Sequence, residues 1–222
     1  DRVPALEARK IRLIMELRQS GIKDTRVLSA IERVPRDVFV SPAFIDQAYE
    51  NTALPIDQGQ TISQPYVVAF MAEALELEER SKVLEVGTGS GYQAAVLSKL
   101  CRRVFSVERY RSLLRQAGAN YKALGIHNVV TRYGDGTKGW PEQAPIGRIL
   151  VTAAAADVPP ALADQLDEGG IMIVPVGEEY GEQQVLRVTR TADGFDHEQL
   201  LPVRFVPLVE GGPDFNLDDS ES

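Results

Sequence analysis

The stretch Val83-Leu-Glu-Val-Gly-Thr-Gly-Ser-Gly91 decides the fold. Its first half is an apolar run of the kind that ends a buried strand. Three glycines follow on alternate positions, and glycine allows a tight turn and a close approach to a ligand because it lacks a Cβ. Residues 92–100 (YQAAVLSKL) then have a helical composition. A strand, a glycine turn and a helix form the first unit of a doubly wound sheet, which binds its ligand at the carboxyl edge.

An acid precedes this turn, because Glu85 lies two residues before Gly87 in an ExGxGxG pattern. The dinucleotide fingerprint is GxGxxG, and a diphosphate is disfavoured beside a carboxylate. A ligand that carries a sulfonium or ammonium group has the opposite preference. The pattern therefore favours a cationic, phosphate-free cofactor such as S-adenosyl-L-methionine (AdoMet). The alternative is a tight strand-to-helix turn that binds nothing.

Strand-like and helical segments alternate from Lys82 onward. The predicted strands are 82–86, 103–107, 128–132, 148–152 and 170–175, and the predicted helices are 91–100, 110–124 and 158–166. This alternation predicts an α/β fold with a doubly wound, mostly parallel sheet of about seven strands and helices on both faces. Residues 183–190 and 198–206, joined through Asp193-Gly194, are typical of an antiparallel strand pair at one edge of the sheet.

The remaining segments predict one domain over residues 1–222. Residues 1–80 form a helical and irregular extension, with helices over 4–20 and after Asp24. The α/β core covers 81–208, and the Gly-, Pro- and Asp-rich residues 209–222 form a flexible tail.

Composition excludes several classes of function. The net charge is −8 without a basic block, which argues against nucleic acid as a partner. Cys101 is the only cysteine and the two histidines lie far apart, so we expect no disulfide and no metal site. No apolar run approaches the ~20 residues of a membrane span, and no signal peptide is visible. We therefore expect a cytoplasmic protein that does not bind membranes; the sequence does not fix its oligomeric state, although a monomer is favoured.

Three further strand ends point to the same sheet edge. Glu108 ends the second strand, where an acid binds a ribose diol by two hydrogen bonds; the alternative is a helix cap or a surface acid. Asp135 lies in a Gly-Asp-Gly turn after the third strand, where it either accepts from an adenine amino group or forms a simple Asx turn. The fourth strand runs into small residues from Ala153, which leave room for a ligand.

The segment Gln60-Thr-Ile-Ser-Gln-Pro-Tyr66 opens another helix, because Pro65 suits a first helical position. Ser63 then lies just outside the helix, beside its positive dipole end and its unpaired N–H groups. A carboxylate is well placed there. The alternative is that Ser63 only caps or turns the chain.

Together these segments resemble the protein-L-isoaspartate O-methyltransferases within the class I AdoMet-dependent methyltransferases. The resemblance covers the chain from its first helix to Leu208. It rests on Ala53–Ile56, Gly59–Tyr66, Val83–Gln93, Gly134–Trp140, Ile149–Ala155, Pro159–Leu162 and Val203–Leu208. The Gly-Gln-Thr-Ile-Ser-Gln-Pro segment is the most specific part, because other methyltransferases lack it.

The resemblance implies transfer of a methyl group from AdoMet to the α-carboxylate of isoaspartyl residues in damaged peptides and proteins, leaving S-adenosyl-L-homocysteine. It assigns Ser63 to the active site. The implied AdoMet-binding residues are Gln64, Glu85, Gly87, Thr88, Gly89, Gly91, Glu108, Arg109, Asp135 and Gly136. The implied substrate-binding residues are Thr61, Ile62, Ser63, Val206 and Leu208. Gly147, where an acid is expected, and Asp57 depart from the family pattern.

Two other functions stay open at this point. A methyltransferase of a small-molecule carboxylate would share the core and differ in the first eighty residues and the last strand. A non-catalytic AdoMet-binding module would bind the cofactor without turnover. A pair of peptides that differ only in isoaspartate against aspartate separates these functions.

Overall fold

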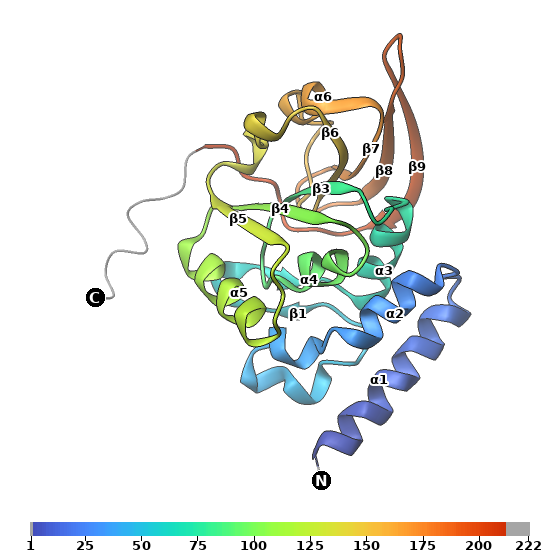
Figure 1. Ribbon diagram of the computed structural model, residues 1–222, viewed down its shortest axis with the longest axis vertical. Helices are drawn as coiled ribbons and strands as arrows, with labels where there is room; N and C mark the ends of the chain where they lie inside the picture. The colour runs from blue at the N-terminus through green and yellow to red at the C-terminus, as the bar shows by residue number, and fades with distance from the viewer. Residues whose placement is uncertain (1, 212–222) are drawn as a thin grey trace.

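The computed structural model describes residues 2–211, so most of the predicted flexible tail, residues 212–222, lies outside the described residues. Seven strands form one sheet in the order β5-β4-β3-β6-β7-β8-β9 (Figure 1). These strands are β3 (Lys82–Val86), β4 (Arg103–Glu108), β5 (Val129–Tyr133), β6 (Ile146–Val151), β7 (Leu166–Gly177), β8 (Gln183–Arg190) and β9 (Phe195–Val203). A separate antiparallel pair consists of β1 (Leu54–Pro55) and β2 (Thr61–Ile62).

Helices connect and flank these strands. The α-helices are α1 (Arg2–Gln19), α2 (Thr25–Arg33), α3 (Pro65–Ala74), α4 (Tyr92–Ser98), α5 (Arg111–Ala123) and α6 (Pro160–Gln165). The 3-10 helices are η1 (Arg36–Phe39), η2 (Pro42–Gln47), η3 (Asp57–Gly59), η4 (Gly136–Lys138) and η5 (Pro141–Gln143). Within residues 2–211, none of the helices has the length and apolar character needed to span a bilayer.

The sheet has a parallel part and an antiparallel edge. The strands β5, β4, β3, β6 and β7 pair in parallel with their neighbours. β7 pairs with β8 and β8 with β9 in antiparallel register. The predicted fold class is therefore confirmed, and each predicted strand of the core is present. The largest difference is β7, which begins at Leu166 rather than at residue 170.

Two hydrophobic cores lie on opposite faces of the sheet because successive side chains of a strand point to opposite sides. Val83 belongs to the core beneath α1–α5, whereas Leu84 and Val86 belong to the core that contains Leu162 of α6. Figure 1 shows α4 and α5 on one face and α6 on the other. Glu85 follows Val83 by two residues, so its side chain points to the same face as Val83, the face that α4 and α5 cover.

The N-terminal third is ordered in spite of its many prolines. Asp24 caps α2, as predicted, by accepting a hydrogen bond from the Arg26 backbone N–H at 2.9 Å. Residues 35–62 form the short elements η1 to β2, and Phe39 and Tyr49 are buried beneath them. β2 leads directly to Ser63 and then to α3, whose first residue is Pro65 as predicted.

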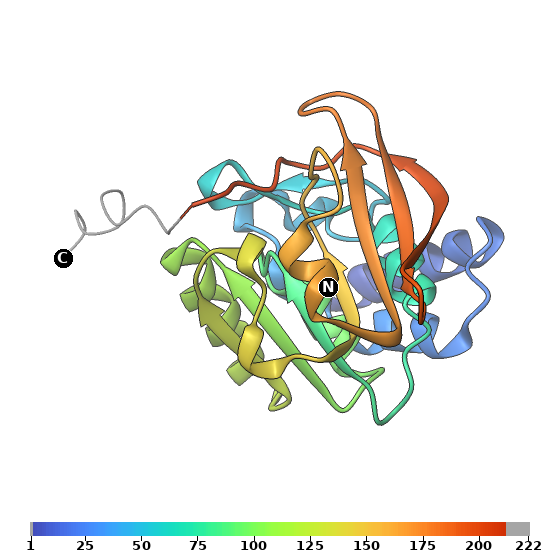
Figure 2. The same cartoon turned by 90° about the horizontal axis from the view of Figure 1, so that it is seen from above.

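The segment after β9 crosses the carboxyl edge of the parallel strands (Figure 2). Ala154, just after β6, donates to the Val206 carbonyl at 2.8 Å and accepts from the Leu208 N–H at 2.7 Å. The Gly211 N–H then donates to Asp135 Oδ2 at 3.1 Å. This segment therefore joins the loops after β6 and β5 at the sheet edge where α/β proteins bind ligands.

Candidate active site

A cavity of about 890 Å³, its open mouth included, lies at the carboxyl ends of β3, β4 and β6. Five segments far apart in sequence form most of the wall: the residues around β2, the glycine turn with the start of α4, the end of β4, the residues after β6 and the segment after β9. The lining residues are Gln60, Thr61, Ile62, Ser63, Val68, Val86, Gly87, Thr88, Gly89, Ser90, Tyr92, Gln93, Val107, Glu108, Arg109, Tyr110, Gly136, Thr152, Ala153, Val206, Pro207, Leu208 and Val209.

The glycine turn is held by the two neighbouring strands. The N–H groups of Gly87 and Thr88 donate to the Val107 carbonyl at 2.9 and 3.3 Å. On the other side, Thr152 Oγ1 lies 2.7 Å from the Gly87 carbonyl oxygen, to which it donates. Gly87 has φ of +99°, and a Cβ there would lie 2.4 Å from Thr152 Oγ1. Only glycine therefore fits this position without a shift in the turn.

Glu108 fixes the turn to the end of β4. Its Oε2 accepts from the Gly89 N–H at 2.9 Å, and its Oε1 accepts from the N–H groups of Arg109 and Tyr110 at 2.8 and 3.2 Å. Burial raises the pKa of this carboxyl, and the backbone donors oppose that rise. Glu108 is the only carboxylate that lines the cavity among the described residues, and Oε2, which accepts from one N–H group, keeps lone-pair capacity for a further donor.

Glu85 does not reach the cavity, which corrects the expectation that its charge faces the cofactor. The side chain is 0% exposed and points to the face of the sheet that α4 and α5 cover. Its Oε1 accepts from Ser106 Oγ at 2.6 Å, and Oε2 has no partner within the described residues. Burial raises the pKa of Glu85 to about 8. The acid of the ExGxGxG pattern therefore lies beneath the turn rather than in front of it.

Three other implied cofactor residues also lie outside the cavity wall. Gly91 precedes α4 with φ of +90°, and a Cβ there would lie 2.7 Å from the Tyr121 hydroxyl oxygen, so backbone conformation and packing favour glycine there. Gln64 is the residue before α3 and is not among the lining residues. Asp135 forms the Asx turn that the sequence left open, because Oδ1 accepts from the Thr137 N–H at 2.9 Å.

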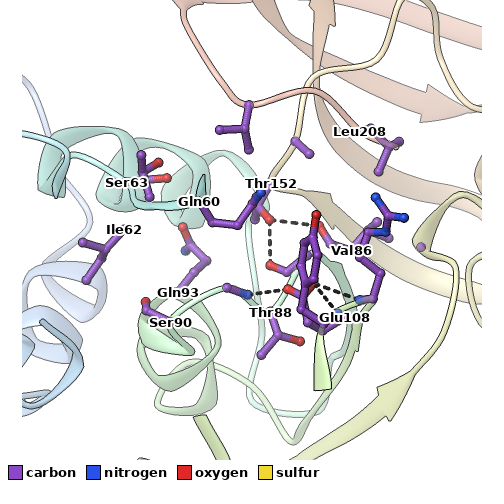
Figure 3. A pocket seen from close by; sticks show the side chains of 18 of the residues that line it. Gln60, Ile62, Ser63, Val86, Thr88, Ser90, Gln93, Glu108, Thr152 and Leu208 are labelled. Atoms are coloured by element: carbon purple, nitrogen blue, oxygen red, sulfur yellow. Dashed lines mark hydrogen bonds between the residues drawn. The ribbon is translucent and has the colours of Figure 1, made fainter. Parts of the chain in front are cut away.

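The acceptor side of the cavity comes from the segment before α3. Thr61, Ile62 and Ser63 line it, as do Val206 and Leu208 from the segment after β9. Figure 3 shows Gln60 and Ser63 on one side of the cavity, and Thr88 and Glu108 on the other. Ser63 is half-buried, and its hydroxyl has no hydrogen-bond partner within residues 2–211. This hydroxyl is available to a ligand.

The residues that sequence reasoning missed lie next to those it found. Ser90 is inside the quoted glycine turn, and Tyr92 and Gln93 form the first turn of α4. Thr152 and Ala153 follow β6, where the small residues had indicated room for a ligand. The others are Gln60, Val68, Val86, Val107, Tyr110, Pro207 and Val209. Strand order and the path of the C-terminal segment bring them together, and neither leaves a local signal.

The two family departures lie away from this wall. Gly147 lines a second cavity with residues such as Lys82 and Arg148, near the opposite ends of the strands. Asp57 accepts from Gln116 Nε2 at 2.7 Å. Cys101 is a buried packing residue, and burial raises the pKa of its thiol to about 12.

Three features define the fold and site of a class I methyltransferase. They are a glycine turn after the first parallel strand, an acid at the end of the next strand, and a facing wall for a second reactant. A model of the protein-L-isoaspartate(D-aspartate) O-methyltransferase family matches residues 8–212. The chain belongs to this family.

Relatives and solved structures agree with this assignment. The protein-L-isoaspartate O-methyltransferase of Paramagnetospirillum magneticum is 63% identical over 209 residues, which cover 94% of this chain and 98% of the relative. That of Rhodospirillum rubrum is 65% identical over 94% of this chain and 96% of the relative. A solved protein-L-isoaspartate O-methyltransferase superposes with a TM-score of 0.82 and 31% identity, covering 92% of this chain and 67% of that chain.

A second solved structure contains a ligand. It is described as a putative protein-L-isoaspartate O-methyltransferase from Plasmodium falciparum in complex with S-adenosyl-L-homocysteine. It has a TM-score of 0.77 and 26% identity, and the match covers 90% of this chain and 98% of that chain.

Proposed function

We propose that the protein transfers the methyl group of AdoMet to the free α-carboxylate of L-isoaspartyl residues in damaged proteins and peptides. The observation that carries this proposal is the cavity itself, which joins the glycine turn and Glu108 to Ser63 in a chain of this family. The resulting methyl ester closes to a succinimide, whose hydrolysis partly restores normal aspartate.

The cavity wall fits AdoMet. The backbone from Gly87 to Ser90 presents no side chain larger than Thr88 to a ligand at the carboxyl edge, and Glu108 Oε2 offers acceptor capacity for one ribose hydroxyl. Apolar side chains such as Val107 and Leu208 offer contacts for an adenine ring. When bound, AdoMet supplies an electrophilic methyl group on a positively charged sulfur.

The residues of the chain need only bind and orient the acceptor. An α-carboxyl has a pKa of about 3.5 and is already ionised at neutral pH, so no general base is required. The lining of the described chain accordingly contains no histidine, and its one carboxylate, Glu108, is engaged by three N–H groups. The Ser63 hydroxyl can donate to one carboxylate oxygen and so hold it in line with the methyl group.

Paired peptides test the proposal directly. The protein is incubated with labelled AdoMet and two peptides that are identical except for isoaspartate or aspartate at one position. We expect base-labile incorporation of label into the isoaspartyl peptide alone. Equal labelling of both peptides, or none of either while AdoMet binds, would reject the proposed acceptor. A panel of small carboxylates then separates a small-molecule methyltransferase from a non-catalytic binding module.

We also propose that residues 1–208 fold as one domain and that the protein is a cytoplasmic monomer. One hydrophobic core extends from Leu13 of α1 to Val185 of β8, which supports the single domain. A single cooperative unfolding transition, monitored through both circular dichroism and fluorescence, is expected. Sedimentation analysis tests the monomer, and fractionation of cells tests its location.

A further inference from the structure

Arg36 is a charged residue that the fold buries completely. It begins η1, and its side chain is 0% exposed. Its Nη2 donates to the Ser63 carbonyl at 2.9 Å and lies 3.4 Å from the Thr52 carbonyl. The guanidinium lies over the ring of Tyr92, with its Cζ 4.9 Å from the ring centroid. Arg36 therefore contacts two residues of the cavity wall, Ser63 and Tyr92, from behind.

No carboxylate within residues 2–211 forms an ion pair with this guanidinium. The neighbouring acid, Asp37, instead accepts a hydrogen bond from the Tyr49 hydroxyl at 2.6 Å. Arg36 Nε and Nη1 are buried and have no hydrogen-bond partner in the described chain. Burial lowers the pKa of Arg36, but guanidinium stays protonated in proteins. The fold thus retains a buried positive charge that its own residues do not neutralise.

Such a charge is costly, since a buried ion loses its hydration, and the two carbonyl contacts and the Tyr92 ring offset only part of that loss in the absence of a carboxylate partner. A purely structural anchor for two carbonyl groups needs no charge and no unsatisfied N–H groups. A reactant that brings a negative charge to the same wall removes this cost. The acceptor of the proposed reaction is such a reactant, because its carboxylate must approach Ser63.

The only carboxylate of the cavity wall within the described residues therefore lies on the opposite side from Arg36. Glu108 lies on the side of the glycine turn, next to the cation Arg109, and Arg36 lies behind the side formed by Ser63, where the described wall has no carboxylate. A cationic cofactor and an anionic acceptor are the pair of reactants that this arrangement complements. Because Arg36 is buried, its attraction for an anion is little screened by salt.

We propose that Arg36 is a positioning residue for the acceptor: it holds the Ser63 peptide through Nη2 and attracts the carboxylate that is to be methylated. The proposal rests on the proposed function, because it takes the isoaspartyl α-carboxylate as the anion. Arg36 acts through Ser63 and through its electric field, without a place in the cavity lining.

The test compares the binding of two ligands to the unaltered protein, to two variants of Arg36 and to one control variant. The ligands are an isoaspartyl peptide and the same peptide with isoasparagine, whose α-carboxamide is neutral. Calorimetry measures the binding of each to the protein saturated with S-adenosyl-L-homocysteine. Arg36→Met removes the charge at similar volume, and Arg36→Lys keeps it. Arg148→Met is the control. The Arg148 side chain also donates to backbone carbonyls, but it lines the second cavity, at the opposite edge of the sheet from the candidate active site.

We expect Arg36→Met to reduce the preference for the charged peptide at least tenfold, with cofactor-product affinity within threefold of the unaltered protein. Arg36→Lys and Arg148→Met should keep the preference within about threefold. Equal weakening of both peptides in Arg36→Met would show a packing role and overturn the inference. Loss of preference in Arg36→Lys as complete as in Arg36→Met would also overturn it, because the charge would not be the cause.

A measurement on the unaltered protein keeps the inference testable if Arg36→Met does not fold. The preference for the charged peptide should change less than about threefold between about 0.05 and 0.5 M salt, since an exposed cation would be strongly screened over that range. A steep loss would assign the preference to surface charges and overturn the inference. Absence of methylation of the isoaspartyl peptide by the unaltered protein is a different result, which rejects the proposed function and this inference with it.

Discussion

Replacing Glu85 by glutamine is expected to remove a pH dependence from the stability of the fold. The Glu85 carboxyl is fully buried, and the only hydrogen bond to it that the described chain makes comes from Ser106 Oγ. Burial raises its pKa from 4.5 to about 8, and the charge of Glu108 adds to that rise. At neutral pH the native protein therefore carries a protonated Glu85, whereas the unfolded chain has released this proton.

The sign and size of the effect follow from this difference. Below about pH 4.5 both states are protonated, and above about pH 8 both are ionised, so the contribution changes only between these values. In that window the native state binds more protons, and stability falls as pH rises. One pKa unit corresponds to about 1.4 kcal/mol, so the loss across the window is roughly 3–5 kcal/mol.

Urea denaturation at a series of pH values, followed through the fluorescence of Trp140, measures this loss in the unaltered protein and in Glu85→Gln. Glutamine leaves a buried amide in place of Oε2, and that offset of about 1–3 kcal/mol is the same at each pH. The difference in stability between the two proteins should therefore change by several kcal/mol in favour of Glu85→Gln between pH ~5 and ~8. Curves that run parallel within about 1 kcal/mol would refute the reasoning, because they would place an ionised Glu85 in the native protein.

Other substitutions test the site. Glu108→Gln should weaken S-adenosyl-L-homocysteine binding by about 10–100-fold through lost charge-assisted hydrogen bonds, as measured by calorimetry. The matched control is Glu142→Gln, because the Glu142 side chain is exposed. Equal affinities of the two variants would contradict a ligand-binding role for Glu108. Ser63→Ala should keep that affinity and lower turnover of the isoaspartyl peptide more than ~tenfold through lost orientation of the acceptor, whereas unchanged turnover would leave Ser63 with a role only in the turn. Gly87→Ala should cost at least ~2 kcal/mol of unfolding free energy, because its Cβ meets Thr152 Oγ1 at positive φ; a loss under ~1 kcal/mol would contradict this strain.

Much of the fold was predictable because its signals are local. The apolar run before Gly87 and the alternation of strands and helices after it predict the parallel core, since hydrophobic period and glycine position act within a few residues. Glu108 and Ser63 were found in the same way, one at the end of a strand and the other before Pro65 at the start of a helix. These positions depend on backbone conformation, which the residues themselves specify.

Only the tertiary structure decided which side chains meet in the cavity. Glu85 and Val86 are adjacent in sequence, yet Glu85 is buried beneath the turn and Val86 lines the cavity, because neighbouring strand residues point to opposite faces. Arg36 lies in an irregular segment without periodicity, and its contact with Ser63 spans 27 residues. The sequence by itself determined the sheet, the glycine turn and the chemistry available at the strand ends. Strand order, face and the packing of distant segments determined which of those groups reach the reactants, because such contacts form only when the whole chain is folded.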